Sequence, residues 1–312
     1  MADATIAAIG CSGSIAAPFI SGFLNGGVKV RLLARNPAEV ATRCAGAEVV
    51  AGSMSSPHAV AQLVKGVDAA FLMTPMGLRN NPGSEIDIAY RVIEGARAGG
   101  LSHLVYTSVL GADVHRGVGI LDAKYEIERM IRASGIPCTI LRCGSYMEDV
   151  FNLRLALLDK GRFLFPVNRQ RRFRYTCQRD VPAFVAHLLA SGGPGGVINF
   201  VAPREYSLGK VEQALSEASG KRIRATAKFP TYYLYHSLLP FFHLAGHRFS
   251  SIIPLVRYFD RHGYSDTGSD VGSRYPEFRM TTLEEHLSGL WPERQRPAPL
   301  GSVSLPKKKT GK

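Results

Sequence analysis

The chain has 312 residues, of which 46% are hydrophobic and 20% are charged. This composition excludes a disordered or fibrous chain and predicts a globular protein with a full hydrophobic core. The formal net charge of +13 is large, but part of it lies in residues 301–312, which we expect to form a disordered basic tail.

The other basic cluster contains Arg169, Arg171, Arg172 and Arg174 with aromatic neighbours, a composition that also occurs in nucleic-acid sites. An exposed loop leading into a strand accounts for it as well, and we expect no nucleic-acid partner. The five cysteines form no CxxC pair, which favours reduced thiols and a cytoplasmic location.

The first element is an apolar strand, Ile6 to Ile9, followed by a glycine-rich turn and a helix that ends near Asn25. Gly10 permits a sharp turn, Gly13 lets the backbone approach a pyrophosphate, and the small Ala16 lets helix and strand pack closely. The alternative is a turn with a purely structural role. The predicted cofactor contacts in this segment are Gly10, Ser12, Gly13, Ser14 and Ile15.

The second strand, residues 28–34, is followed by Arg35, where a NAD-binding protein would carry an acidic residue for the ribose hydroxyls. The distance from Gly13 is close to the expected spacing of about 20 residues. A guanidinium is suited to a 2′-phosphate, and this favours NADP(H) over NAD. A solvated arginine at a strand end is the alternative.

Strands and helices then alternate, which predicts a parallel sheet built from βαβ units. The expected strands are 47–51, 69–73, 103–107 and 138–142, and the expected helices are 57–64, 84–98 and 120–133. We therefore predict an α/β fold with a Rossmann-type doubly wound parallel sheet. Its ligand would bind at the carboxyl ends of the strands, and further predicted cofactor contacts there are Thr74, Pro75, Thr107, Ser108, Cys143 and Ser145.

The regular alternation ends near Val150. We expect residues 1–150 to form the NADP-binding domain and residues 151–300 to form a smaller mixed α/β substrate lobe, some strands of which join the main sheet. In this lobe the expected strands are 172–176 and 196–201, and the expected helices are 181–190 and 208–219.

The stretch 230–246 is uncharged and rich in aromatic residues. At 17 residues it is shorter than a membrane span of about 20 residues, and we expect no membrane association. A lid or wall over an apolar substrate is our interpretation, with buried packing or an oligomer face as the alternative. Three histidines, His236, His243 and His247, are seven and four residues apart, a spacing that would place them on one face of a helix. Pro240 interrupts such a helix and no carboxylate joins them, so we expect no metal site.

Eight segments of the sequence form a recognisable pattern together: 9–13, 35–37, 71–75, 104–108, 123–128, 139–142, 146–148 and 179–181. In concert they resemble the NmrA-like branch of the atypical short-chain dehydrogenase/reductase superfamily. Ser108 and Lys124 match the serine and lysine of short-chain dehydrogenases, but Ile120 stands where their usual tyrosine would be. Gly52-Ser53 and Cys143 also depart from the common pattern of relatives.

The resemblance implies a Rossmann core, NADP(H), a small substrate lobe and a bond from Lys124 to the nicotinamide ribose. It implies a reductase of a small apolar, aromatic, quinone or carbonyl-type substrate, for example in natural-product metabolism. We expect a monomer or homodimer. The alternative is a catalytically silent regulator that senses NADP(H) and acts through a protein partner.

The sequence leaves the proton donor open, because the tyrosine of short-chain dehydrogenases is missing. Our candidates for catalysis are Tyr146, His115, Ser108 and Lys124, the last as a donor only if burial lowers its pKa. Each has a structural alternative: Tyr146 as wall packing, His115 as a solvated loop residue and Lys124 as a ribose ligand only.

Overall fold

The computed structural model describes residues 4–12, 16–74, 82–114, 117–152, 155–165, 167–192, 195–226, 252–264 and 268–291. Among the predicted site residues, Gly13, Ser14, Ile15, Pro75 and His115 lie outside these ranges, as do the aromatic stretch 230–246 and the tail 301–312.

The centre of the molecule is a seven-stranded sheet. Its strands are β1 (Thr5–Ile9), β2 (Lys29–Ala34), β3 (Glu48–Ala51), β4 (Ala69–Leu72), β5 (Leu104–Val109), β6 (Cys138–Cys143) and β11 (Gly196–Phe200). The order across the sheet is β11-β6-β5-β4-β1-β2-β3, and every neighbouring pair is parallel. This arrangement confirms the predicted Rossmann-type fold class. The strand order reverses between β1 and β4, which places a ligand crevice at the end of β1.

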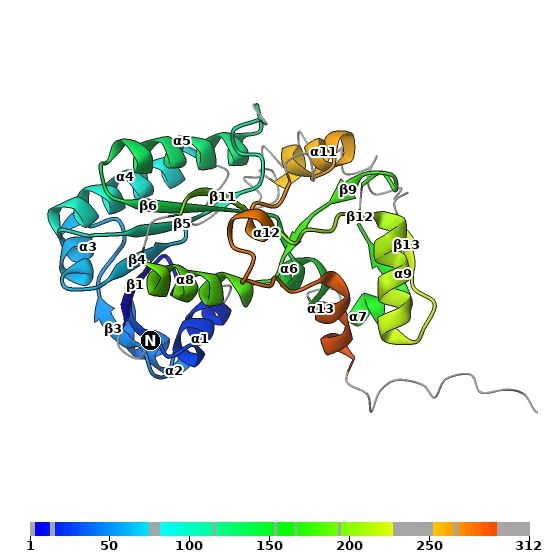
Figure 1. Ribbon diagram of the computed structural model, residues 1–312, viewed down its shortest axis with the longest axis horizontal. Coiled ribbons are helices and arrows are strands. Elements are labelled where there is room, and N and C mark those ends of the chain that lie inside the picture. The colour runs from blue at the N-terminus through cyan, green and yellow to red at the C-terminus, as the bar shows by residue number, and fades with distance from the viewer. Residues whose placement is uncertain are drawn as a thin grey trace, which may run out of the picture.

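Helices cover both faces of the sheet (Figure 1). One face carries α3 (Pro57–Val64), α4 (Pro82–Ala98) and α5 (Gly119–Ala133), and the other carries α1 (Ala17–Asn25), α2 (Pro37–Arg43) and α8 (Asp180–Ser191). Each face of the sheet packs against its helices in a separate hydrophobic core. Alternate residues of β1 pack in the two cores, because successive strand side chains point to opposite faces. Ala7 and Ile9 pack in the first core, and Ile6 and Ala8 pack in the second.

The small lobe lies beside the sheet, and the C-terminal helices of the described chain lie at and next to this lobe (Figure 1). Among its described residues the longest helix is α9 (Leu208–Ser219). This helix is as predicted, since Ser207 caps its start and Gly220 ends it at a φ of 66°. The other elements of the lobe and its borders are α6 (Met147–Phe151), α7 (Leu155–Leu158), α11 (Ile252–His262), α12 (Val271–Arg274), α13 (Leu283–Leu290), β7 (Ser145–Tyr146), β8 (Arg162–Leu164), β9 (Arg172–Phe173), β10 (Tyr175–Thr176), β12 (Tyr206–Ser207) and β13 (Arg224–Thr226).

The single strand predicted over 172–176 is wrong, because two short strands occupy that segment. β9 pairs antiparallel with β12, whereas β10 pairs parallel with β7. The break falls at Arg174, whose backbone N–H donates to the carbonyl of Tyr264 at 3.0 Å. Gly144 packs against the Arg174 carbonyl so closely that a Cβ there would lie 2.4 Å from its oxygen. The chain therefore bends at this point and contributes to two sheets.

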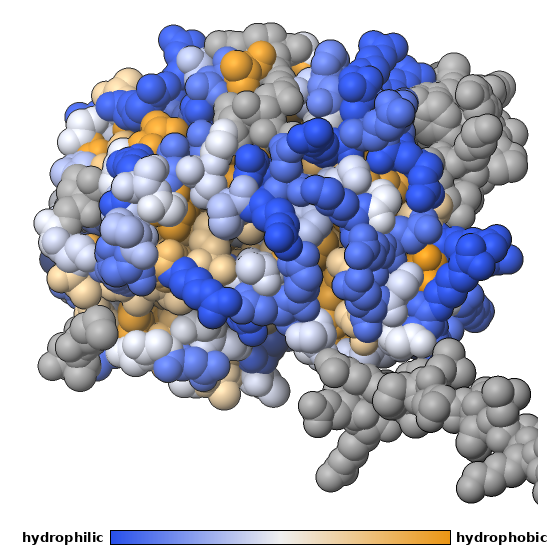
Figure 2. Space-filling view, turned by 45° about the vertical axis from the view of Figure 1, so that its right-hand side comes forward, coloured by the Kyte–Doolittle hydropathy of each residue, from blue (hydrophilic) through white to orange (hydrophobic). Residues whose placement is uncertain are grey.

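Two elements from beyond residue 150 belong to the main sheet layer. β11 pairs with β6 along its whole length, and α8 packs beside α1. On the face drawn in Figure 2, polar side chains dominate the described surface and apolar ones form separated patches. Within the described ranges, no helix combines the length and the apolar character needed to cross a bilayer.

Candidate functional site

The turn after β1 is built for a close backbone approach. Gly10 has a φ of +79°, and a Cβ at this position would lie 1.9 Å from the carbonyl oxygen of Met73. Only glycine fits there, since the left-handed backbone and the contact with the neighbouring strand end both exclude a side chain. The buried Cys11 that follows packs in the core and not in the crevice.

A cleft of about 300 Å³ opens at this turn, at the carboxyl ends of β1, β2 and β3. It brings together three residues predicted from the sequence, Gly10, Ser12 and Arg35. Its apolar and small lining residues, which could hold a flat base, are Leu33, Gly52, Ser53, Met54, Ser55 and Ile88. Met54, Ser55 and Ile88 were not identified from the sequence, because nothing in their spacing marks them as neighbours of Gly10.

Two arginines border this cleft. The Arg35 side chain is exposed, and within the described part of the chain it has no hydrogen-bond or ion-pair partner. Arg43, at the end of α2, donates to the Ser12 carbonyl at 2.6 Å and contacts Glu39 at 3.4 Å. Arg43 was missed by sequence reasoning, although a basic residue on the helix after Arg35 is a detectable signal. Together they make this edge of the cleft suitable for an anion.

Lys124 lies in a buried polar cluster between β4, β5, α4 and α5. Its ammonium contacts Glu85 at 2.9 Å and donates to the Thr74 hydroxyl at 2.8 Å. Thr74 in turn donates to Glu85 at 2.6 Å, and the ammonium lies 5.4 Å from the ring centroid of Tyr106. Thr74 and Lys124 were predicted; Glu85 and Tyr106 were not, because only the packing of α4 and β5 brings them here.

The electrostatics of this cluster correct one sequence-based expectation. Burial alone would lower the pKa of Lys124, as a direct proton donor would require. The pKa is instead raised above its ordinary value, because the oxygens of Tyr106 and Glu85 favour the charged ammonium. Burial also raises the pKa of Tyr106 to about 12. Lys124 is therefore a fixed positive charge, which suits a binding role.

Ser108 lies in a different network. Its hydroxyl donates to Glu128 at 2.6 Å, and Glu128 accepts two bonds from Arg142, at 2.9 and 2.6 Å. Arg142 also contacts Asp113 at 2.7 Å. Ser108, Glu128 and Arg142 are buried and tie β5, α5 and β6 together. The structure thus occupies the Ser108 hydroxyl in a structural contact, and the predicted catalytic role gains no support from it.

Cys143, at the end of β6, interacts with both Lys124 and Tyr146. The buried Cys143 thiol interacts electrostatically with the Lys124 ammonium and forms a hydrogen bond with the Tyr146 hydroxyl. Burial raises the pKa of Cys143 to about 12 and that of Tyr146 well above its ordinary range. The Tyr146 ring also meets Phe19 of α1 edge-on, with centroids 5.6 Å apart. Tyr146 is therefore next to the helix that follows the glycine-rich turn.

The remaining predicted contacts lie at strand ends as expected. The buried Thr107 hydroxyl donates to the Leu72 carbonyl at 3.4 Å, and Ser145 pairs with Tyr175 in the short β7–β10 ladder. Ile120, where a catalytic tyrosine would stand, is buried on α5.

The model of the NmrA-like family matches residues 2–287. The chain belongs to the NmrA-like family. Its curated relatives include an NAD(P)H azoreductase of Xenophilus azovorans, 25% identical over 183 residues, which are 58% of this chain and 62% of the relative. The match thus spans less than two thirds of that relative's length.

Another relative is quinone oxidoreductase 2 of Escherichia coli, 27% identical over 193 residues, which cover 61% of this chain and 65% of the relative. The solved structure of the NADPH-dependent quinone oxidoreductase from Escherichia coli with NADPH has a TM-score of 0.72 at 24% identity, over 92% of this chain and 100% of that one. The structure of NmrA, a negative transcriptional regulator in complex with NADP, has a TM-score of 0.69 at 18% identity, over 95% and 97%. Proteins with this fold therefore include both a named oxidoreductase and a named transcriptional regulator.

Proposed function

We propose that this protein binds NADP(H) and is an NADPH-dependent reductase of a small apolar acceptor, such as a quinone, an azo compound or an aromatic carbonyl. The observation that carries the proposal is the cleft at the ends of β1 to β3, which joins a turn that admits only glycine to the exposed Arg35, a side chain with no partner among the described residues. The first feature fits a pyrophosphate, and the second fits a 2′-phosphate. The names of the azoreductase and quinone oxidoreductase relatives support the reductase class.

In this proposal the parts of the chain have separate tasks. The sheet domain holds the cofactor, and NADPH, when bound, supplies a hydride. Lys124 holds a positive charge beside Thr74 and binds ribose hydroxyls, while Glu85 keeps that charge in place. Residues 151–300 provide the substrate lobe.

Tyr146 remains our candidate for the group that hydrogen-bonds the substrate oxygen. Its raised pKa keeps the hydroxyl protonated, so that it can donate a hydrogen bond, although a weak acid transfers a proton less readily. His115, the other candidate, lies outside the described residues.

A regulator that senses NADP(H) is the second candidate function. The observation in its favour is the buried Ile120, at the position where short-chain dehydrogenases carry their catalytic tyrosine. A sensor would need only different affinities for NADP and NADPH, coupled to a surface that meets a partner.

The specificity prediction concerns Arg35. We expect Arg35→Asp to weaken NADPH binding by about 10- to 100-fold, since a charge-assisted bond to phosphate is lost and a repulsion is added. NADH lacks the 2′-phosphate, and its affinity should change little. Calorimetric titration with both cofactors measures this difference, and equal losses for NADPH and NADH would remove Arg35 from the site.

The reductase proposal is tested by incubating the protein and NADPH with quinones, azo dyes, enones and aromatic ketones while nicotinamide absorbance is followed. We expect turnover with at least one class, a fall in its rate in Tyr146→Phe, and no change in Tyr90→Phe, an exposed tyrosine on α4. No turnover across the panel, with a large difference between NADP and NADPH affinities, would favour the regulator.

A further inference from the structure

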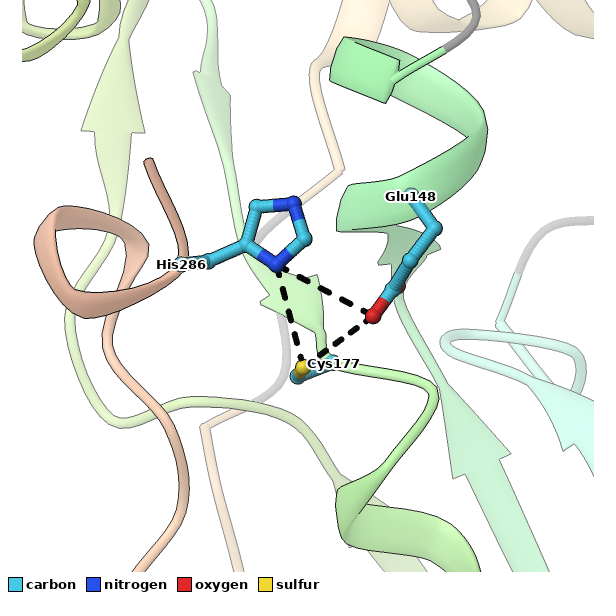
Figure 3. Close-up of side chains that lie close together, drawn as sticks. All are labelled: Glu148, Cys177 and His286. Carbon is cyan, nitrogen blue, oxygen red and sulfur yellow. Dashed lines mark hydrogen bonds and ion pairs between the residues drawn. The ribbon is translucent and has the colours of Figure 1, made fainter. Parts of the chain in front are cut away.

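Three side chains that the proposed reaction does not use converge at the border of the small lobe (Figure 3). Glu148 comes from α6, Cys177 from the segment between β10 and α8, and His286 from α13. The Cys177 thiol lies 3.1 Å from a Glu148 oxygen and 3.9 Å from Nδ1 of His286, and that Nδ1 lies 3.9 Å from the same Glu148 oxygen. Sulfur, oxygen and nitrogen thus point at one shared centre.

The spacing of these atoms fits a tetrahedral metal ion. Zinc bonds of about 2.3 Å to sulfur and about 2.0–2.2 Å to nitrogen and oxygen imply separations between ligand atoms of about 3.4–3.6 Å. The observed separations of 3.1 and 3.9 Å lie on either side of this range. Shifts of a few tenths of an ångström in the side chains would bring the three separations into this range.

The surrounding contacts already orient two of the ligands. Both Glu148 oxygens accept the backbone N–H of Gln178, at 3.1 and 3.0 Å. Nε2 of His286 lies 3.0 Å from the side-chain carbonyl oxygen of Asn152. Because that oxygen can only accept, Nε2 carries the proton and the lone pair of Nδ1 faces Cys177. A histidine fixed in this way by an outer hydrogen bond is typical of metal sites.

We propose that Glu148, Cys177 and His286 bind a zinc ion. The mixture of thiolate, imidazole and carboxylate favours a borderline-soft divalent ion over magnesium or calcium, which require oxygen ligands. Three protein ligands leave a fourth position for water, and the site is near the surface, since His286 is 9% and Glu148 21% exposed. On binding, the metal–sulfur bond forms and the thiol proton passes to solvent.

An occupied site would connect three segments that are distant in sequence. Cys177 is 29 residues from Glu148 and 109 residues from His286, a spacing in which no metal motif can be recognised. The ion would join α13 to α6, whose preceding residue is Tyr146. This role is independent of whether the protein is a reductase.

The test uses the full chain without a histidine tag, freed of metal by a chelator. Zinc is titrated in competition with a chromophoric chelator, and cobalt is titrated while thiolate-to-metal charge-transfer and visible bands are recorded. We expect about one equivalent of zinc, a tetrahedral cobalt spectrum with a thiolate band, and a rise in the thermal unfolding midpoint on zinc addition.

The variants separate a site from surface adsorption. Cys177→Ser retains a donor to Glu148 but lacks the sulfur ligand. This variant and His286→Gln should each weaken zinc affinity by at least about 100-fold. Asn152→Ala should weaken zinc affinity by about 10- to 100-fold. Cys138→Ser and His187→Gln, outside the cluster, are the matched controls and should bind as the unmodified chain does. Absence of the thiolate band, or zinc affinity equal in Cys177→Ser and Cys138→Ser, would overturn the proposal and leave a hydrogen-bonded cluster only.

Discussion

Glu128→Ala is expected to lower the free energy of unfolding by about 3–5 kcal/mol, because it leaves the Arg142 guanidinium buried without its bidentate partner. Glu128 is fully buried, and Arg142 retains only the contact with Asp113 among the carboxylates that it meets in the described structure. The Ser108 hydroxyl loses its acceptor as well. Urea unfolding followed by far-UV circular dichroism measures the effect.

The matched control for this prediction is on the same helix. Glu126 pairs with Arg129 at 3.0 Å, but the Glu126 side chain is 42% exposed and that of Arg129 is 60% exposed. We expect Glu126→Ala to change stability by less than about 0.5 kcal/mol, as is usual for surface pairs. Equal shifts for Glu126→Ala and Glu128→Ala would contradict the structural role of the Arg142 network.

The same network gives Ser108→Ala a diagnostic use. A structural hydroxyl bonded to a carboxylate costs about 1–3 kcal/mol when removed, with no direct effect on the chemical step. A large loss of turnover at unchanged NADPH affinity would instead restore the catalytic role that the sequence pattern suggested for Ser108.

Lys124→Met is the second change for which we expect a large effect. It should weaken NADPH binding by about 10-fold or more, through loss of the proposed ribose contact, and should reduce turnover on any substrate found. It also removes the ammonium that faces the buried Glu85, so the variant should be destabilised. Fluorescence titration with NADPH and urea unfolding measure the two effects separately.

A double-mutant cycle distinguishes the ion pair from the ribose contact. Lys124→Met with Glu85→Gln should be more stable than Lys124→Met alone, with a coupling of about 0.5–3 kcal/mol, because both charges leave the interior together. NADPH affinity should stay low in the double variant. If turnover and NADPH affinity are unchanged in Lys124→Met, the residue has neither role and the ion pair with Glu85 is structural.

Local patterns in the sequence determined the layout of the sheet domain. Alternating apolar strands and helices, with a glycine after the first strand, require a parallel doubly wound sheet, since each βαβ unit can bury its apolar faces only by stacking on the next. Gly10, Ser12 and Arg35 meet in one cleft for the same reason, because the carboxyl ends of parallel strands share one edge. The resemblance to the NmrA-like family rested on these segments, and the family model confirms it.

Only the tertiary structure decided which polar groups became partners. Lys124 meets Glu85, Ser108 meets Glu128, and Cys177 meets His286, all across sequence separations that local patterns do not encode. A buried charge must find an opposite charge or a hydrogen bond, but the sequence does not say which of many candidates packing will bring within about 3 Å. The raised pKa of Lys124 follows from that pairing and not from burial, which by itself acts in the opposite direction.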